Sequence, residues 1–487
     1  MLIQENKLWL HYSGLFILTY FIVFLKLDSF HMRWWDESLF AVNTYEMLHN
    51  GKYFSLYFNN APDLFNTKPP LTSWVQLFFV KLFGYNELAL RLPSAISATL
   101  TIFIIFHFLR KNFSLIWAWL SSLILLTSQG FVNFHTARTA DSDAILTLFL
   151  TIGNLYFIQF LLKENKKHIF LFLLFISLAF ATKLYAALLF CPAYLILLCQ
   201  QKKLKDFIFN KYFLLGSFLF LGSGMILILL RENDSRGYIN EIFFKDAGRL
   251  FTAIEDHEQS FDYYVRNLFN WRFSTWVLLI FLSLFFYSIS QSLYARMIVG
   301  SSLWFTASYL LIISISTTKL EWYDMPLFPF MAIAAGYSVY KISEIVFADR
   351  DSASFSLILF IVCIFAIPYY QMFDKAEANT IINEEKAFES SEALIFKYIK
   401  QNKSLDGLNV LYSRYIGSLL FYKYKLKEKG RTITLTKNPS FSINDKVLVC
   451  EKSLLNILNE KYIFEIKDSY NESKLIEIKK VMADIAQ

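Results

Sequence analysis

Long apolar runs separated by short polar loops occupy the chain as far as about residue 373. A run of roughly 17 to 25 residues with almost no charge is long enough to cross a bilayer as a helix, whose backbone polar groups are satisfied internally. The pattern predicts an α-helical polytopic membrane protein with about 11 transmembrane helices. The predicted spans lie near residues 8–25, 91–109, 113–130, 144–162, 168–182, 184–200, 212–230, 273–290, 297–315, 325–342 and 354–371.

The composition agrees with this prediction. Hydrophobic residues make up 55% of the chain and charged residues only 18%, and the mean hydropathy is +0.40. A soluble protein carries roughly a quarter charged residues, so a soluble enzyme and a disordered chain are excluded. The net charge of +7 does not indicate a nucleic-acid partner, because most Lys and Arg punctuate apolar segments instead of covering a water-facing surface. The four cysteines, Cys191, Cys199, Cys363 and Cys450, lack the paired spacing of a disulfide framework or a metal site.

The basic residues of the short loops predict the orientation, since Lys and Arg are retained on the cytoplasmic side. One set of alternate loops holds twelve of them: Arg110, Lys111, Lys163, Lys166, Lys167, Lys202, Lys203, Lys205, Lys211, Arg296, Lys341 and Arg350. The opposite short loops hold three, Arg138, Lys183 and Lys319. This asymmetry places the N-terminus in the cytoplasm and two long loops, 26–90 and 231–272, outside. The first span has only Lys7 before it and no small-residue cleavage site after it, so we expect a retained anchor.

The end of the chain, residues 374–487, has a different pattern. Short β-rich runs alternate with helical stretches, which is typical of a small α/β domain. The β-rich runs lie at 408–412, 431–435 and 446–450, and the helical stretches at 416–426 and 454–460. With an odd number of spans, this domain is expected outside the cytoplasm, attached to a membrane domain formed by residues 1–373.

The first outer loop carries the strongest candidate chemistry. Its opening stretch, Arg33-Trp34-Trp35-Asp36-Glu37, taken alone favours an interfacial anchor. Residues 37–50 have the pattern of a helix on the membrane surface that ends at Gly51. The apolar run 71–83 is too short to cross, so it is a second such helix or a re-entrant segment. Between them, two prolines fix the backbone that carries Lys68. An acid and a base are thus expected together at bilayer level.

The order of these motifs is similar to that of a known family. Asp36-Glu37 and a helix are followed by Lys68-Pro69-Pro70-Leu71 with Trp74, then Phe83-Gly84-Tyr85-Asn86-Glu87 and Arg91-Leu92-Pro93-Ser94. Further matches are Ala137-Arg138-Thr139-Ala140 leading to Asp143, residues 257–264, and Lys319 with Tyr323 and Pro326. Over about residues 10–370 the chain resembles the membrane-embedded (GT-C type) glycosyltransferases. Within these it looks most like the bacterial branch of the protein mannosyltransferase superfamily, which includes the aminoarabinose transferase of lipid A and the rhizobial galacturonosyltransferases.

The resemblance implies transfer of one sugar from a polyprenyl-phosphate carrier to an acceptor outside the cytoplasmic (inner) membrane of a bacterium. The expected acceptor is lipid A or lipopolysaccharide, another envelope glycan, or a protein. A lipid-linked donor agrees with the sequence, which has no glycine-rich phosphate loop. Cleavage of the bond to the carrier phosphate leaves negative charge on that phosphate, so fixed cations beside it lower the barrier. The candidates in the outer loops are Lys68, Arg138 and Lys319; Lys183 is interpreted as a snorkelling anchor.

Two carboxylates are the candidate catalytic residues. The acceptor hydroxyl loses a proton as it attacks, and Asp36 matches the family position proposed for the base. Asp143, at the start of a span, also matches an acidic residue of the family. Asp141-Ser142-Asp143 spells D-x-D, but a helix N-cap explains either aspartate equally well. No residue calls for a covalent glycosyl-enzyme, so we expect the anomeric centre to be inverted.

Further candidate substrate contacts are Glu37, Arg91, His257 and Tyr323. Arg91 serves the phosphate or caps its loop, and Tyr323 lines the site or belongs to an aromatic belt; both alternatives stay open. Some relatives place a divalent ion near a Glu before Lys-Pro-Pro, where this chain has Thr67, so we expect no required metal or other cofactor.

The main alternative function is a transporter or flippase of lipid-linked sugars. Transporters place ionisable residues at mid-membrane within repeated, broken helices, whereas here the charges gather in outer loops. An oligosaccharyltransferase or O-antigen ligase lacks support, because the chain shows no W-W-D-Y-G-type signature. A receptor that acts through its tail is a third class, in which the motifs of the first loop would have no role.

Overall fold

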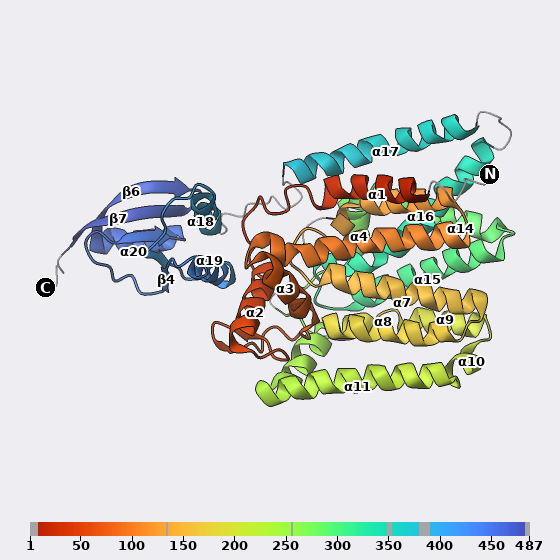
Figure 1. Cartoon of the computed structure of the whole chain (residues 1–487), viewed down its shortest axis with the longest axis horizontal. Coiled ribbons are helices and arrows are strands. Elements are labelled where there is room, and N and C mark those ends of the chain that lie inside the picture. Colours follow the sequence, from red (N-terminus) through yellow and green to blue (C-terminus); the bar gives the residue numbers. More distant parts are fainter. Residues whose placement is uncertain (1–7, 133–134, 255–256, 348–352, 379–389, 483–487) are drawn as a thin grey trace.

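The computed structural model describes residues 8–132, 135–254, 257–347, 353–378 and 390–482. A bundle of long helices forms the membrane part, and a small domain that contains a β-sheet lies at one end of it (Figure 1). The helices of the membrane part are α1 (Leu8–Val23), α2 (Asp36–Asn50), α3 (Leu71–Phe83), α4 (Glu87–Asn112), α5 (Leu115–Leu126), α6 (Gln129–Val132), α7 (Asp143–Lys163), α8 (Lys167–Lys183), α9 (Cys191–Gln200), α10 (Leu204–Ile208), α11 (Lys211–Asp234), α12 (Tyr238–Glu241), α13 (Tyr263–Asn267), α14 (Val277–Ile289), α15 (Leu293–Ile315), α16 (Phe328–Val346) and α17 (Ala353–Glu377). Shorter 3₁₀ or π turns are η2 (Leu184–Leu188), η3 (Ile242–Ala247), η4 (Gly248–Leu250), η5 (Leu268–Arg272) and η6 (Glu321–Leu327).

A helical segment lies at each of the eleven predicted spans. Six helices among the described residues are long and apolar enough to cross a membrane, namely α4, α7, α8 with η2, α11, α15 and α17. A seventh span results if the pair Tyr263–Arg272 and Val277–Ile289, bent by 106°, is counted as one. The chain is thus a multi-pass membrane protein. The count of eleven stays a prediction, because α1, α5 and α9 are shorter apolar helices.

The first outer loop forms α2 and α3, joined by a small hairpin of β1 (Tyr57–Phe58) and β2 (Ala61–Pro62). Both helices have the predicted bounds, and Gly51 ends α2 with a left-handed φ of 68°. The surroundings of α2 differ from the prediction of a surface helix, because every residue from 37 to 47 is buried. Protein covers its polar side as well as its apolar side.

The C-terminal domain, here residues 390–482, is built on one mixed sheet with strand order β4-β3-β5-β7-β6. Its elements are α18 (Ser390–Lys400), β3 (Leu408–Leu411), α19 (Gly417–Lys427), β4 (Ile433–Thr436), β5 (Lys446–Val449), α20 (Lys452–Lys461), β6 (Tyr462–Tyr470) and β7 (Ser473–Val481). The three predicted strands form the parallel half of the sheet, and β6 and β7 complete it as an antiparallel pair. The fold class is therefore as predicted, while the domain boundary near residue 374 stays a prediction.

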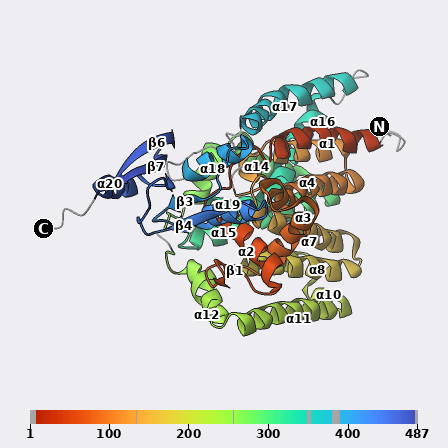
Figure 2. The same ribbon diagram turned by 60° about the vertical axis from the view of Figure 1, so that its left-hand side comes forward.

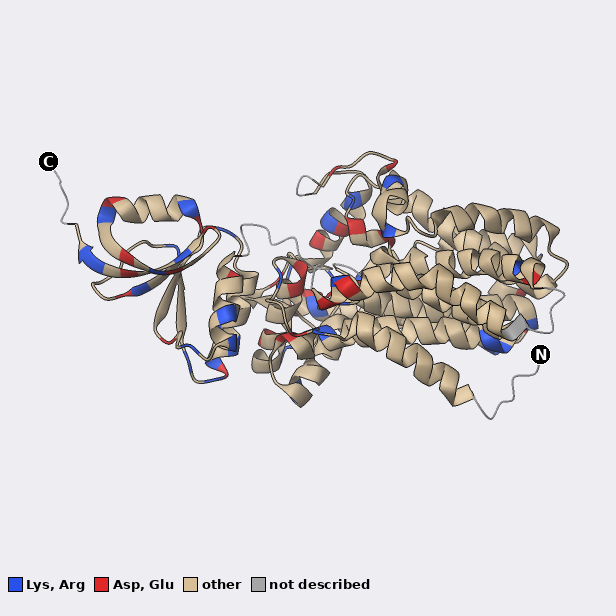
Figure 3. Cartoon of the chain, turned by 90° about the horizontal axis from the view of Figure 1, so that it is seen from above, with Lys and Arg blue, Asp and Glu red and all other residues tan. Residues whose placement is uncertain are grey.

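The C-terminal domain and the first outer loop lie at the same end of the bundle, with α19 against α2 (Figures 1 and 2). One hydrophobic cluster joins them, since it contains Ala41, Val42 and Tyr45 of α2 together with Leu420 and Phe421 of α19. Charged residues gather at this end and at the opposite ends of the helices, while the long helices are almost free of them over most of their length (Figure 3).

Candidate active site

A cavity of about 1140 Å³ opens where the first outer loop meets the ends of the helices. Its apolar lining includes Leu184 and Leu188 of η2, the following Leu189, and Ile312 and Ile313 of α15. Its lining also includes six ionisable groups: Asp36, Lys68, His135, Asp143, Lys183 and Arg249. A cavity lined by both apolar and charged side chains suits an amphiphilic ligand.

Asp36 and Lys68 face each other in this cavity. The Lys68 ammonium lies 3.8 Å from Oδ1 of Asp36, and the two side chains are 18% and 22% exposed, respectively. Burial by itself would raise the pKa of Asp36, but the positive side chains around it, first Lys68, outweigh that effect and hold the pKa below its usual value. The Asp36 carboxyl is therefore ionised at neutral pH and can accept a proton.

Asp143 and Lys183 form a second acid and base pair in the lining of the cavity. Nζ of Lys183 donates a 2.7 Å hydrogen bond to Oδ1 of Asp143. The ammonium also lies 4.7 Å from the centre of the Tyr323 ring. The interpretation of Lys183 as a snorkelling anchor was wrong, because its charge points into the cavity and not toward a lipid headgroup.

The loop that carries Lys68 is fixed by Arg231, at the end of α11. Its guanidinium donates to the carbonyl oxygens of Lys68 at 2.6 Å, Asp63 at 2.8 Å and Asn66. Tyr238 adds a 2.8 Å hydrogen bond to the carbonyl of Thr67. Because these donors are buried in protein, the backbone around Lys68 is rigid and its side chain has a defined direction.

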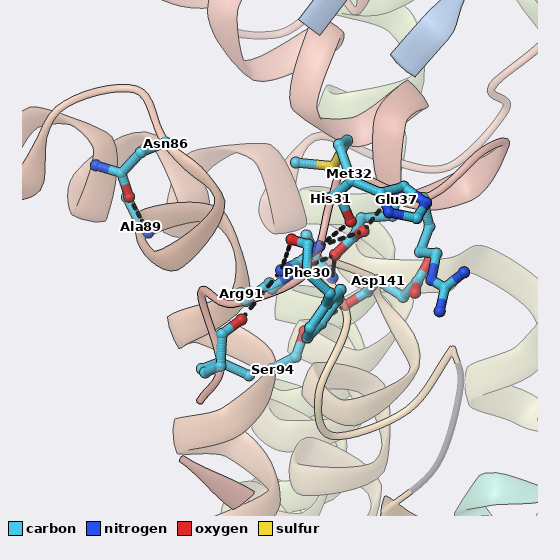
Figure 4. Close-up of polar contacts among 12 residues, drawn as sticks. Phe30, His31, Met32, Glu37, Asn86, Ala89, Arg91, Ser94 and Asp141 are labelled. Atoms are coloured by element: carbon cyan, nitrogen blue, oxygen red, sulfur yellow. Dashed lines mark hydrogen bonds and ion pairs between the residues drawn. The ribbon is translucent and has the colours of Figure 1, made fainter. Parts of the chain in front are cut away.

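Glu37 and Arg91, proposed as possible substrate contacts, form a buried ion pair, and for Arg91 the observed contacts correspond to the alternative of capping its loop. The Arg91 guanidinium donates two hydrogen bonds, of 2.7 and 3.0 Å, to the Glu37 carboxylate, and both side chains are fully buried (Figure 4). The same guanidinium donates to the carbonyl oxygens of Leu27, Phe30 and His31. Burial would raise the pKa of Glu37, but the Arg91 charge and hydrogen bonds hold it below its usual value. This pair ties the start of α2 to α4, outside the cavity lining.

The structure places Arg138 and Lys319, the other two residues predicted to bind the phosphate, away from the cavity lining. Arg138 is fully buried and donates to the carbonyl oxygens of Ile22, Val23 and Leu25, beyond the end of α1. Lys319 donates to the carbonyl oxygens of Gln259 and Ser316. Neither is among the described residues that line the cavity. Both cations instead satisfy backbone oxygens that would otherwise be buried without a donor.

His257 and Tyr323 do line the cavity, as proposed from the sequence. Tyr323 accepts a hydrogen bond from Arg249, a cavity residue that the sequence did not single out. Burial raises the pKa of Tyr323, although the positive charges of Arg249 and Lys68 oppose that effect, so its hydroxyl stays protonated. Arg249 and Lys183 thus both lie over the Tyr323 ring.

His135, missed from the sequence, lies beside Asp141 and Asp36. Its Nδ1 is 3.2 Å from Oδ1 of Asp141, and its ring stacks on Trp322 at 3.6 Å between centres. Burial lowers the pKa of His135, but the Asp141 carboxylate more than offsets this, so the pKa lies above its usual value. Within the described ranges, Asp36, His135 and Asp141 are the group whose ligand atoms, all within 4.8 Å of one another, fit a metal ion.

A family model described as dolichyl-phosphate-mannose-protein mannosyltransferase matches residues 67–226. Among curated proteins, an uncharacterized protein of Aquifex aeolicus (strain VF5) is 28% identical over 303 residues, which is 61% of this chain and 58% of that protein. The undecaprenyl phosphate-alpha-4-amino-4-deoxy-L-arabinose arabinosyl transferase 1 of Proteus mirabilis (strain HI4320) is 27% identical over 52% of this chain and 45% of its own length. The chain thus spans about half of these relatives.

Among solved structures, ArnT from Cupriavidus metallidurans bound to undecaprenyl phosphate superposes with a TM-score of 0.72 at 15% identity. The match covers 97% of this chain and 98% of ArnT, so it includes the C-terminal domain. These findings confirm the predicted placement: the chain has the GT-C fold and resembles the ArnT-like bacterial branch of the protein mannosyltransferase superfamily.

Proposed function

We propose that this chain, with its GT-C fold, is an inverting glycosyltransferase that moves one sugar from a polyprenyl-phosphate-sugar to an acceptor outside the cytoplasmic membrane. The observation that carries the proposal is the pairing of Asp36 and Lys68, 3.8 Å apart within one cavity that also has an apolar wall. A base and a phosphate-binding cation are the two groups that such a transfer needs at close range.

The donor fits a cavity whose lining contains both apolar and basic residues. The prenyl chain is proposed to lie along η2 and α15, where leucine and isoleucine side chains form the lining. Its phosphate then faces Lys68, Lys183 and Arg249. A phosphate bound by several basic groups in a partly desolvated site is held far more strongly than in water.

The chemical step is a displacement at the anomeric carbon. The bond between that carbon and the phosphate oxygen breaks, the acceptor oxygen forms the new bond, and the bonding electrons leave with the carrier phosphate. Lys68 and Lys183 stabilise the charge on the departing phosphate. Asp36 takes the proton of the acceptor hydroxyl.

Inversion follows if the acceptor attacks the donor directly. The second carboxylate, Asp143, is held by Lys183 at 2.7 Å, which favours a role in orienting that ammonium over a role as a nucleophile. The product linkage is then opposite in configuration to the donor linkage, and nuclear magnetic resonance of the isolated product measures this directly.

We further propose that transfer requires no metal, because three fixed basic side chains already face the phosphate. Asp36 and Asp141 each have a basic neighbour, Lys68 and His135 respectively. Transfer at an unchanged rate after chelation with EDTA supports this. Loss of transfer on chelation, restored by a divalent ion, would instead make Asp36, His135 and Asp141 the ligands to substitute first.

The active end of the bundle is proposed to face the periplasm, as the distribution of basic loop residues predicts. Reporter fusions after residue 377 test this orientation and the odd number of spans.

The acceptor class is lipid A or lipopolysaccharide, another envelope glycan, or a protein. Mass spectrometry of envelope lipids, glycans and glycoproteins from cells with and without the gene identifies it, since the modified species loses one sugar mass.

A reconstituted assay separates the transferase from a flippase of lipid-linked sugars. The protein in proteoliposomes receives a polyprenyl-phosphate-sugar and the acceptor identified above. A transferase forms the glycosylated acceptor and free polyprenyl phosphate in equal amounts. Movement of the donor between leaflets without any product would overturn the proposed function in favour of transport.

A further inference from the structure

An aromatic side chain of the C-terminal domain stacks on the residue that precedes Asp36. The ring of Tyr415, in the loop between β3 and α19, lies 4.5 Å from the ring of Trp35 with an angle of 18° between the planes. Phe58 stacks on Tyr415 at 5.7 Å, and Nε1 of Trp34 donates to the Tyr415 carbonyl at 3.2 Å. Two neighbouring tryptophans of the first outer loop are thus held by one residue from the far end of the chain.

Trp35 needs such support because of its backbone. Its φ of 64° lies in the left-handed region, which is costly for a bulky residue. This residue is the N-cap of α2, and its carbonyl accepts hydrogen bonds from Leu39 N and Ser38 Oγ. The direction in which α2 presents Asp36 to the cavity therefore depends on the conformation of Trp35.

The rest of α19 fixes the two parts against each other. Tyr424 donates a 2.7 Å hydrogen bond to Glu46 and stacks on Tyr45 at 4.2 Å. Lys425 forms a buried ion pair with Glu87. Separating the two parts would break this ion pair and expose the apolar cluster that joins them, which disfavours separation.

The close approach extends to the backbone at the start of α19. A Cβ atom added to Gly417 would lie 2.7 Å from Oγ of Ser38 and 2.5 Å from the Tyr415 hydroxyl. A side chain at this position would force Ser38 or Tyr415 to shift, so the glycine permits the close approach of α19 to α2. The position of Tyr415 over Trp35 is therefore set by direct contact between two helices.

From these contacts we infer that Tyr415 is a positioning residue of the active site, through which the C-terminal domain holds Trp35 and, with it, Asp36. Trp35 lines the cavity, whereas Tyr415 is not among the described lining residues, so Tyr415 acts through Trp35. The inference rests on the proposed role of Asp36 as the base. It assigns the C-terminal domain a part in the chemical step instead of a role as a passive appendage.

The test compares full-length variants in proteoliposomes, with rates expressed per donor site counted by bound undecaprenyl phosphate. Tyr415→Ala is expected to lower kcat per site by about tenfold or more, since misplacement of a reacting group by about 1 Å costs up to a hundredfold. KM for the donor is expected to stay the same, because the cations and the apolar wall are untouched. Tyr415→Phe keeps the stacked ring and is expected to restore the rate.

Two further measurements separate positioning from general damage to the protein. In a Trp35→Ala background, Tyr415→Ala is expected to cause no additional loss, because its effect passes through Trp35. Phe441→Ala, which alters a separate hydrophobic cluster of the same domain, is expected to leave kcat per site unchanged. If Tyr415→Ala does not fold, Tyr415→Leu keeps the bulk and removes the stack.

Several outcomes would overturn the inference. Tyr415→Ala with a normal kcat per site, a loss explained entirely by fewer donor sites, or additive losses with Trp35→Ala each contradict it while leaving the proposed function in place. An unsubstituted protein that transfers no sugar overturns the proposed function itself, and the inference falls with it.

Discussion

Lys183 donates a 2.7 Å hydrogen bond to Asp143, although 40 residues separate them along the chain. Asp143 is the first residue of α7 and Lys183 the last residue of α8. Two neighbouring helices joined by a short loop run antiparallel, so the start of one and the end of the next meet at the same end of the bundle. The pair borders the cavity and places a positive charge within reach of a bound phosphate.

Loss of Lys183 is expected to affect both donor binding and stability. Lys183→Ala leaves the Asp143 carboxylate without its partner, at a cost of roughly 1–3 kcal/mol in the free energy of unfolding. The double variant Lys183→Ala with Asp143→Ala is expected to recover thermal stability but not donor affinity. Undecaprenyl phosphate binding and melting temperature measure the two effects. Recovery of donor affinity in the double variant would show that Lys183 does not bind the phosphate.

Substitution of the proposed base is expected to stop the chemical step alone. Asp36→Asn should lower the transfer rate by a factor of about 10² to 10⁴, which is the usual contribution of a general base. Donor binding should persist, because Lys68 remains. Asp28→Asn, on the same loop but exposed, is the matched control and should transfer normally. A normal rate for Asp36→Asn would exclude Asp36 as the base.

The pH dependence of transfer follows from the pKa of Asp36, which lies below its usual value. A carboxylate with a lowered pKa stays ionised until the pH falls past that pKa, so the rate should hold as the pH is lowered and should decline only below the usual range of an aspartate pKa. Lys68→Ala removes the principal positive charge, which raises the pKa and moves the acid limb of the profile upward. Lys81→Ala, an exposed change on α3, serves as the control. Coincident profiles for wild type and Lys68→Ala would contradict the pairing.

Arg138 is expected to matter for stability and not for the donor. Arg138→Ala leaves three carbonyl oxygens near the end of α1 without their donor, so the melting temperature should fall. KM for the donor should equal that of the wild type for the protein that remains folded. If Arg138→Ala lowered the donor affinity while the melting temperature stayed the same, the prediction that Arg138 contacts the phosphate would be supported.

Arg231 is expected to influence the donor site from a distance. Arg231→Ala removes the hydrogen bonds that hold the backbone of residues 63–68, so Lys68 loses its fixed direction. Donor KM should rise several-fold, while Arg231→Lys, with a single ammonium, should restore only part of the affinity. A donor KM equal to that of the wild type would show that the loop holds its shape without this guanidinium.

The sequence predicted the elements of this protein well. The helix 37–50 with its Gly51 cap and the parallel strands of the C-terminal domain all lie close to their predicted positions. The strands β6 and β7 were missed, because their exposed faces carry many Lys and Glu residues and their alternation is weak. Asp36, Lys68 and Asp143 were singled out and do share a cavity.

Other residues could not be assigned before the chain was folded. Lys183 and Arg138 were both predicted to lie in short outer loops. The Lys183 charge lies in the cavity lining, whereas Arg138 donates its hydrogen bonds to backbone oxygens. No local pattern distinguishes them, since each is a single cation beside an apolar run. His135 and Arg249 carried no motif, and the stack of Tyr415 on Trp35 joins segments 380 residues apart.

The amino-acid sequence alone determined where the helices lie and that acid and base gather at one end of them, because run length and loop charge are local properties that the bilayer enforces. Only the tertiary structure decided which charges reach the cavity and which hold the protein together. The direction of a charged side chain depends on the nearest buried partner, and that partner comes from a distant part of the chain.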